Sequence, residues 1–119
     1  MPLGRASRGE IWFLQLPTDP PEKGRRPIII VSSEARNIRD AADTVLVIPL
    51  STSVHKAGSP THLLLLAGET GLPADSIARA EDITTVRKTQ LVPPRIGLRI
   101  LSNRRICELA EKVKFAMSC

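Results

Sequence analysis

The stretch Arg25-Arg26-Pro27-Ile28-Ile29-Ile30-Val31 decides the fold of this chain of 119 residues. Its last four residues are all β-branched and carry no polar alternation. Such a run is typical of a strand that is covered on both faces or curled into a small barrel. We therefore expect residues 28–31 to form the best-defined strand of the core.

Apolar runs on both sides of this stretch predict further strands. The loop 17–23 before it contains three prolines, which cannot continue a hydrogen-bonded ladder. Ser102 or Asn103 can cap a helix whose apolar positions follow the i, i+3, i+4 rule to Met117. The other expected strands cover residues 10–16, 44–50, 61–66, 76–83 and 96–100. The predicted fold is mainly β, a small curled antiparallel barrel with a C-terminal helix.

Length and composition indicate one domain over residues 1–119. Hydrophobic residues make up 42% of the chain in strand-sized runs, which excludes disorder along most of it. We expect a cytoplasmic protein, since no apolar stretch is long enough to cross a membrane and no signal peptide is recognisable. Cys107 and Cys119 have no nearby Cys or His at zinc spacing, so we expect reduced cysteines and no metal or other cofactor.

The chain is basic, with 17 Lys and Arg against 12 Asp and Glu and a formal charge of +5. This charge favours a polyanionic partner such as RNA or DNA, although many basic proteins bind no nucleic acid. Aromatic residues make up only 3% of the chain, which argues against a surface that stacks several bases. Bound RNA would then be read by hydrogen bonds and by the planes of arginine side chains.

Polar residues at two strand ends predict a phosphate site. Arg25 and Arg26 precede the strand 28–31, and Ser51-Thr52-Ser53 follow the strand 44–50. If these strands are antiparallel neighbours, Arg26 lies close to Ser51. A guanidinium beside hydroxyls and backbone N–H groups binds phosphate. The alternative, from the residues alone, is a solvated arginine pair next to a Ser/Thr turn.

Such a site could cleave RNA without a metal. The 2′-hydroxyl of the substrate can act as the nucleophile, so the enzyme must supply only a base, an acid and a cation. Arg26 suits the cation, which stabilises the charge that builds on the phosphorane, and Ser51 or Thr52 can hold a non-bridging oxygen. Glu81 and His62 are candidates for the proton transfers.

Two neighbouring strands carry these candidates. The alternation of strand 76–83 places Arg79 and Glu81 on one face. His62 opens strand 61–66, and His55 in a basic loop could complete an acid–base pair with it. The alternative is that His62 is a hydrogen-bonded structural residue and that His55 is solvated.

Four motifs taken together resemble the MazF/PemK toxins in order and spacing: Arg8-Gly9-Glu10-Ile11-Trp12, residues 24–32, residues 48–53 and Leu72-Pro73-Ala74-Asp75-Ser76. The resemblance implies an SH3-like barrel that forms a homodimer and binds RNA near the dimer interface. It also implies a sequence-specific, metal-independent endoribonuclease that cuts single-stranded mRNA to a 2′,3′-cyclic phosphate and a 5′-hydroxyl. A cognate antitoxin that blocks the groove is a further implication.

Carried over by position, the resemblance assigns catalysis to Arg26 and to Ser51, with Thr52 as a one-residue alternative. It places Glu22 and Lys23 in the loop beside the RNA. Arg79 and Glu81 match positions that some members use to bind RNA or to assist proton transfer. The expected RNA-binding residues are Glu22, Lys23, Arg25, Ser53, His62, Arg79 and Glu81.

The chain departs from the family pattern in two places. It reads Ile83-Thr84-Thr85 where members often carry Ile-Arg-Thr, and its loop before Gly24 is slightly shorter than in several relatives. Two alternatives share the expected fold without the reaction: a CcdB-like toxin that poisons gyrase, and a barrel that binds RNA without cutting it.

Overall fold

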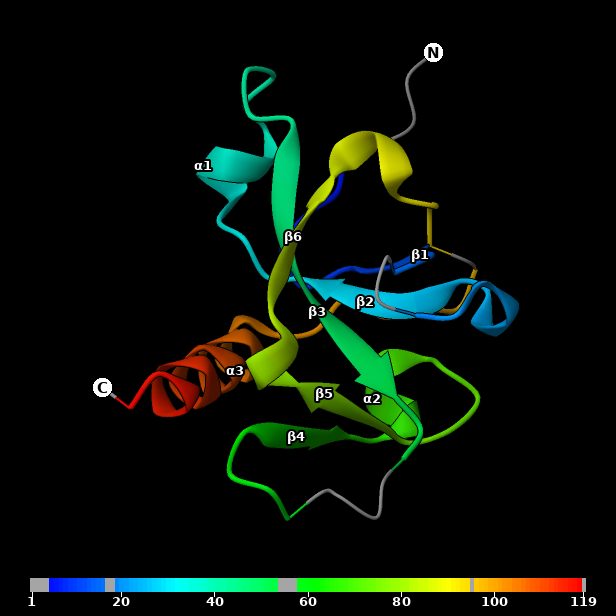
Figure 1. Cartoon of the computed structure of the whole chain (residues 1–119), viewed down its shortest axis with the longest axis vertical. Helices are drawn as coiled ribbons and strands as arrows, with labels where there is room; N and C mark the ends of the chain where they lie inside the picture. The colour runs from blue at the N-terminus through cyan, green and yellow to red at the C-terminus, as the bar shows by residue number, and fades with distance from the viewer. Residues whose placement is uncertain (1–4, 17–18, 54–57, 95, 119) are drawn as a thin grey trace.

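The computed structural model describes residues 5–16, 19–53, 58–94 and 96–118, which form a curled sheet with one long helix (Figure 1). The strands are β1 (Ile11–Leu14), β2 (Arg26–Ile30), β3 (Thr44–Ser51), β4 (His62–Leu65), β5 (Ser76–Arg79) and β6 (Thr84–Arg87). The helices are α1 (Glu34–Asn37), α2 (Ala67–Thr70) and α3 (Asn103–Ala116), with 3-10 turns at Pro21–Lys23, Ala80–Asp82 and Lys88–Gln90. The expected mainly β fold with a C-terminal helix is confirmed.

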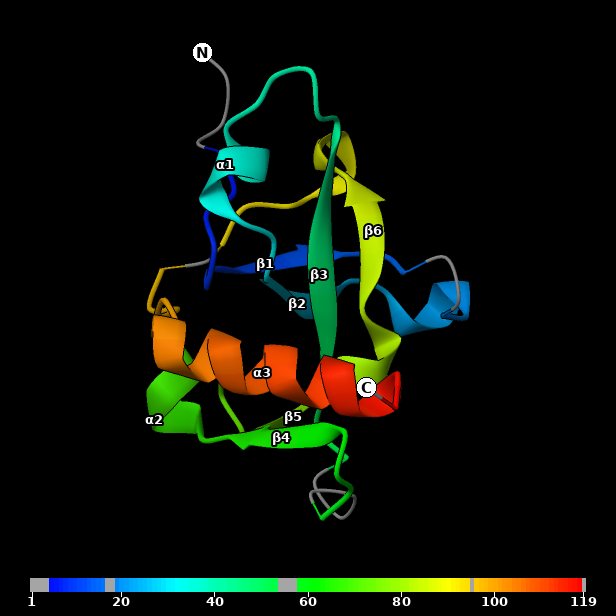
Figure 2. The ribbon, with the colours of Figure 1, turned by 90° about the vertical axis from the view of Figure 1, so that its left-hand side faces the viewer.

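The long strand β3 organises the sheet. It pairs with β6 along its first half, with β2 around its middle and with β5 at its end, always antiparallel. The strand order is β1-β2-β3-β5-β4, with β6 as a branch beside β3. Because β3 changes partners along its length, the sheet curls around it (Figure 2). Among the described residues, strand pairing does not close the sheet into a complete barrel.

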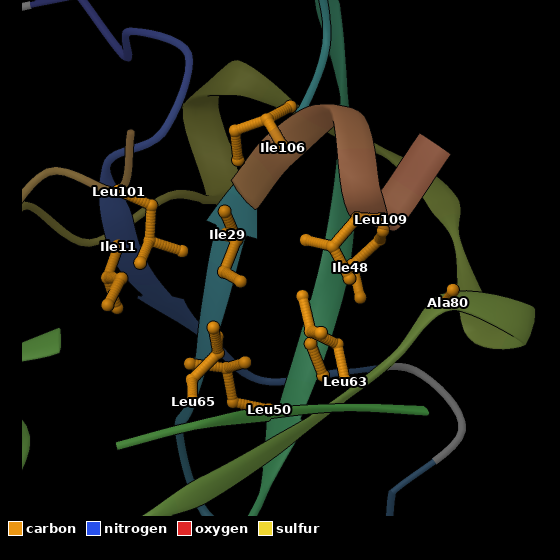
Figure 3. Packing of buried hydrophobic residues seen from close by; sticks show 11 residues of the cluster. Ile11, Ile29, Ile48, Leu50, Leu63, Leu65, Ala80, Leu101, Ile106 and Leu109 are labelled. Carbon is orange, nitrogen blue, oxygen red and sulfur yellow. The ribbon is translucent and has the colours of Figure 1, made fainter. Parts of the chain in front are cut away.

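Hydrophobic side chains fill both faces of the central strands. The cluster under α3 includes Ile29 from β2, Ile48 from β3, and Ile106 and Leu109 from the helix (Figure 3). The opposite face holds Trp12, Leu14, Ile28, Ile30, Val45, Val47 and Val86. All three isoleucines of β2 are 0% exposed. The run without polar alternation is therefore explained, since β2 is buried on both faces.

Helix α3 begins as the sequence predicts. The Ser102 hydroxyl accepts a hydrogen bond from the Arg105 amide at 3.3 Å, the usual role of a capping serine. Only the first half of the predicted apolar stripe is buried, since Met117 is 68% exposed. Among the described residues, no helix is long and apolar enough to span a membrane.

Two predicted strands are corrected. Residues 96–100 form a turn and an extended segment, which contacts the body through single hydrogen bonds such as Arg99 N–H to Thr70 O at 2.8 Å. The sixth strand is β6 instead, in which only Val86 is buried. Its pairing with β3 gives it strand structure that its hydrophobic pattern does not predict. The predicted strand 76–83 ends at Arg79, because a 3-10 turn follows at Ala80–Asp82.

Candidate functional site

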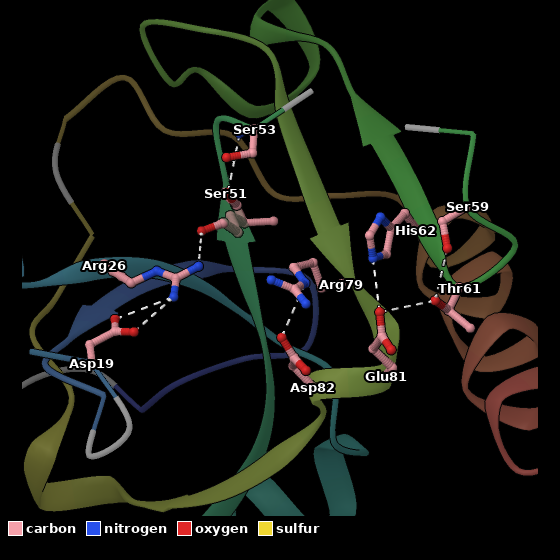
Figure 4. Close-up of polar contacts among 11 residues, drawn as sticks. Asp19, Arg26, Ser51, Ser53, Ser59, Thr61, His62, Arg79, Glu81 and Asp82 are labelled. Atoms are coloured by element: carbon pink, nitrogen blue, oxygen red, sulfur yellow. Dashed lines mark hydrogen bonds and ion pairs between the residues drawn. The ribbon is translucent and has the colours of Figure 1, made fainter. Parts of the chain in front are cut away.

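Arg26 and Ser51 lie beside each other, as the sequence predicts. Strands β2 and β3 are antiparallel with Ile28 opposite Pro49, and Arg26 and Ser51 line one pocket just beyond this pair. The Arg26 Nη2 group donates a hydrogen bond to the Leu50 carbonyl oxygen at 2.9 Å (Figure 4). The guanidinium is therefore fixed at the point where β3 ends.

A pocket of about 320 Å³ opens at this strand end. It is lined by Arg26, Ser51, Thr52, Ser53 and Ser76, together with Pro27 and Leu50. Ser51 is half-buried and its Oγ accepts a hydrogen bond from the Ser53 amide at 3.2 Å, which leaves its own hydroxyl hydrogen to donate. Thr52 is exposed on the same rim. Both hydroxyls are available to a ligand in the pocket, so the one-residue alternative stays open.

Asp19 is a member of this site that the sequence analysis did not predict. Both of its carboxylate oxygens lie 3.2 Å from Arg26 Nη1, and the side chain is only 9% exposed. It lies seven residues before Arg26, in the proline-rich loop between β1 and β2. In the sequence, only the negative charge of Asp19 suggests a partner for an arginine. Which residue an acidic side chain contacts depends on the conformation of its loop, which the sequence does not reveal.

Two further pockets adjoin the first and extend it into a groove. One, of about 490 Å³, shares Arg26 and reaches Asp82, Thr84 and Thr85 beside β6. The other, of about 450 Å³, shares Pro27, Thr52 and Ser76 and is mostly apolar, with Phe13, Leu72, Pro73, Ile96 and Leu98 in its lining. Arg26 thus lies near the middle of the groove. Neither end was predicted from the sequence, because the residues that line these two pockets come from six segments that are far apart along the chain.

His62 and Glu81 form a second cluster. His62 Nε2 lies 2.9 Å from Glu81 Oε1, and the Thr61 hydroxyl donates to the same oxygen at 3.2 Å (Figure 4). These hydrogen bonds hold the pKa of the Glu81 carboxyl below its ordinary value, and the bond with His62 has the larger effect. The His62 side chain is 5% exposed, which agrees with the hydrogen-bonded structural alternative for this residue.

The predicted common face of Arg79 and Glu81 is wrong. The strand ends at Arg79, and the 3-10 turn that follows gives the two residues different partners. Arg79 Nε lies 3.2 Å from Asp82 Oδ2, without the geometry of a hydrogen bond, whereas Glu81 contacts His62. Alternation over eight residues requires a continuous strand, which this segment does not form.

The two clusters lie on different strands. Ser51 pairs with Ile77 on β5, while His62 lies on β4, beyond β5 and opposite Arg79. The structure thus brings together Arg26, Ser51, Thr52 and Ser53 around one pocket, whose lining includes none of His62, Arg79 and Glu81.

The remaining predicted residues lie in or near the loop before β2. Glu22 and Arg25 are both exposed there. The side chain of Lys23 lies outside the described part of the chain, as do His55 and Cys119, while Cys107 is exposed and unbridged. In the described residues, no group of three or more His, Cys, Asp or Glu could hold a metal ion.

Comparisons with known proteins all find similarity to MazF-like toxins. A family model described as PemK-like, MazF-like toxin of type II toxin-antitoxin system matches residues 7–117. Endoribonuclease MazF9 of Mycobacterium tuberculosis is 32% identical over 114 residues, which cover 90% of this chain and 92% of the relative.

Two solved structures share the fold. Toxin MazF-mt6 of Mycobacterium tuberculosis superposes with a TM-score of 0.69 at 25% identity, over 92% of this chain and 96% of its own. An endoribonuclease from a mycobacterial species, solved in complex with its cognate antitoxin, has a TM-score of 0.68 at 20% identity over 98% and 96% of the two chains.

Proposed function

The chain belongs to the family of PemK-like, MazF-like toxins of type II toxin–antitoxin systems, and on that premise we propose that it is an endoribonuclease that cuts single-stranded RNA at the groove around Arg26. The observation that carries the proposal is the pocket at the end of β3, where a guanidinium and four hydroxyl side chains meet. The reaction class comes from the relatives, which are named endoribonucleases.

The proposed reaction uses the substrate's own 2′-hydroxyl. Its oxygen attacks the adjacent phosphorus, a new P–O2′ bond forms and the P–O5′ bond breaks. The products are a 2′,3′-cyclic phosphate and a 5′-hydroxyl, and neither water nor a metal enters this step. Arg26 stabilises the charge that builds on the phosphorane, and Ser51 or Thr52 donates a hydrogen bond to a non-bridging oxygen.

The reaction also needs a base that takes the 2′-hydroxyl proton and an acid that protonates the leaving oxygen. We assign neither role to a single residue. Glu81 is a candidate base because its carboxylate is ionised at neutral pH, and its lowered pKa makes it a weaker base than an ordinary carboxylate. For this role the substrate must extend from Arg26 across β5 to the second cluster. Otherwise His62, Arg79 and Glu81 bind nucleotides that flank the cut.

The groove supplies a path for the RNA. Its pockets on both sides of Arg26 suit a single strand that places one phosphate at Arg26 and neighbouring nucleotides in the adjoining pockets. We propose that Glu22, Lys23, Arg25 and Ser53 contact the RNA from its rim. The formal charge of +5 favours such a partner.

A cognate antitoxin is the proposed protein partner, as for the relative solved with its own antitoxin. We further propose that the chain acts as a homodimer of one domain each, and that it does so in the cytoplasm.

The test is incubation of purified, folded protein with a long single-stranded RNA in the presence of EDTA. We expect discrete cuts, with a cyclic phosphate on one product and a 5′-hydroxyl on the other. Intact RNA under conditions where the fold is verified by circular dichroism would contradict the proposal. Inhibition of gyrase by the same sample would then favour the CcdB-like alternative, and RNA binding without cuts would favour a non-catalytic barrel.

A further inference from the structure

Arg26 does not meet its ligand as an unrestrained side chain. Its Nη1 group faces both oxygens of Asp19 at 3.2 Å, and its Nη2 group donates to the Leu50 carbonyl at 2.9 Å. The Arg26 side chain is only 18% exposed. Its guanidinium is therefore held from two sides before any substrate arrives.

Counting donors shows what this arrangement leaves for a ligand. A guanidinium carries five N–H donors, of which two belong to Nη1 and two to Nη2. Asp19 can use the two on Nη1 and Leu50 uses one on Nη2, so one on Nη2 and the one on Nε remain. In the part of the chain that the structure describes, these two have no partner. When the Leu50 carbonyl takes the Nη2 hydrogen that faces Nη1, the remaining Nη2 and Nε hydrogens are adjacent and match the two-oxygen geometry that phosphate offers.

Asp19 is itself well held. Its backbone amide donates to the Leu16 carbonyl at 3.1 Å, and Leu16 is 5% exposed in the core. Pro20 and Pro21 follow it directly, and their rings restrict the backbone. A short, buried acidic side chain on such a segment is a firm support for a long, otherwise flexible arginine.

We propose that Asp19 is a positioning residue, which holds the Arg26 guanidinium at the end of β3 with two N–H donors directed to the scissile phosphate. This role rests on the proposed function. It also gives the β1–β2 loop a part in the reaction, because the conformation of the loop decides where the Asp19 carboxylate lies.

The test compares Asp19→Ala with Asp19→Asn in the full chain, on a single-stranded RNA that the wild type cuts. An asparagine keeps an oxygen that can accept from Nη1, whereas alanine removes it. We expect kcat of Asp19→Ala to fall about 10-fold or more with KM within about 2-fold, because orientation is lost rather than binding. We expect Asp19→Asn to stay within about 3-fold of the wild type.

Two controls separate positioning from a loss of stability. Asp40 is paired with Arg5 at 3.3 Å on an exposed surface away from the groove, so Asp40→Ala also removes an Asp–Arg ion pair and should leave kcat unchanged. In an Arg26→Ala background, Asp19→Ala should lower the residual single-turnover rate no further, since Asp19 acts through Arg26.

A measurement without RNA tests the contact itself. In the ¹⁵N-labelled full chain, we expect restricted rotation of the Arg26 guanidinium, seen as separate Nη–H signals, in the wild type and in Asp19→Asn. These signals should merge in Asp19→Ala.

Three outcomes would overturn the inference. An unchanged or higher kcat in Asp19→Ala would show that the carboxylate is dispensable or inhibitory. An equal loss in Asp19→Asn, or unrestricted Arg26 signals in the wild type, would contradict positioning by hydrogen bonds. A wild-type protein that cuts no RNA would instead remove the proposed function, and this role with it.

Discussion

Arg26 and Arg105 have equally exposed side chains, 18% each, yet their surroundings differ. Arg105 donates hydrogen bonds to Glu69, to Glu108 and to the Leu64 carbonyl. It does not line any of the pockets described above. Arg26 has one carboxylate and one carbonyl as partners and lines two adjoining pockets. Equal burial therefore does not mean an equal role: Arg105 uses four of its five donors within the fold, whereas Arg26 keeps two donors for a ligand.

The electrostatics of Arg105 agree with a structural role. Burial alone would lower the pKa of its guanidinium, but the carboxylates of Glu69 and Glu108 outweigh this effect and raise it. Through Glu69 and the Leu64 carbonyl, Arg105 joins α3 to the segment around β4. Four of its five donors are engaged within the chain, which leaves no pair of donors for a phosphate.

The largest effect is expected for Arg26→Lys. Lysine retains the charge opposite Asp19 but loses the planar fork of donors, so we expect kcat/KM for RNA cleavage to fall about 100-fold or more. The melting temperature should change little, because the ion pair with the buried carboxylate is kept. Rates on a defined single-stranded RNA, measured beside thermal unfolding, check both. Full activity in this variant would place Arg26 with Arg105 as a structural residue.

The next largest effect is expected for the hydroxyl residues beside Arg26. Ser51→Ala and Thr52→Ala, made separately, remove one hydroxyl each from the same pocket. The variant that loses the hydrogen bond to the non-bridging oxygen should lose about 100-fold in kcat, and the other should lose far less. Single-turnover rates decide between the two positions. Equal and small losses in both would mean that neither hydroxyl contacts the phosphorane.

Arg105→Ala should have the opposite phenotype to Arg26→Lys. It leaves two carboxylates and a carbonyl without their partner, which we expect to lower the free energy of unfolding by about 2 kcal/mol. Urea unfolding measures this loss, and the cleavage rate per folded molecule should stay near that of the wild type. Arg104→Ala, at the exposed neighbouring position, is the matched control. A cleavage defect without a loss of stability would break the comparison.

The smallest effect concerns pH and the second cluster. The pKa of Glu81 is lower in the folded chain than its ordinary value of 4.5, so its ionised form stabilises the fold above that pH. This contribution is lost as pH falls through the folded-state pKa, and Glu81→Gln lacks it at every pH. We therefore expect the stability of the wild type relative to Glu81→Gln to decrease as pH falls below about 4.5. A constant difference in unfolding free energy would show that Glu81 gains nothing from His62 and Thr61.

The sequence predicts those parts of the site that depend on neighbouring strands. Arg26 and Ser51 meet because β2 and β3 pair as antiparallel neighbours, a relation that follows from two apolar runs joined by a loop. The meeting of Asp19 with Arg26 follows from no such rule, since a loop can direct its side chains in many ways. The groove was beyond prediction for a similar reason, because its lining comes from segments far apart along the chain.

The sequence by itself determined the buried strand β2, the capped helix α3 and the basic and hydroxyl residues at two strand ends. These are local properties: β-branched runs, helix caps and breakers act within a few residues. Only the tertiary structure decided that residues 84–87 rather than 96–100 form the sixth strand, and that His62 and Glu81 lie apart from Arg26. Strand pairing and loop conformation depend on partners distant in sequence, whose contacts no local pattern encodes.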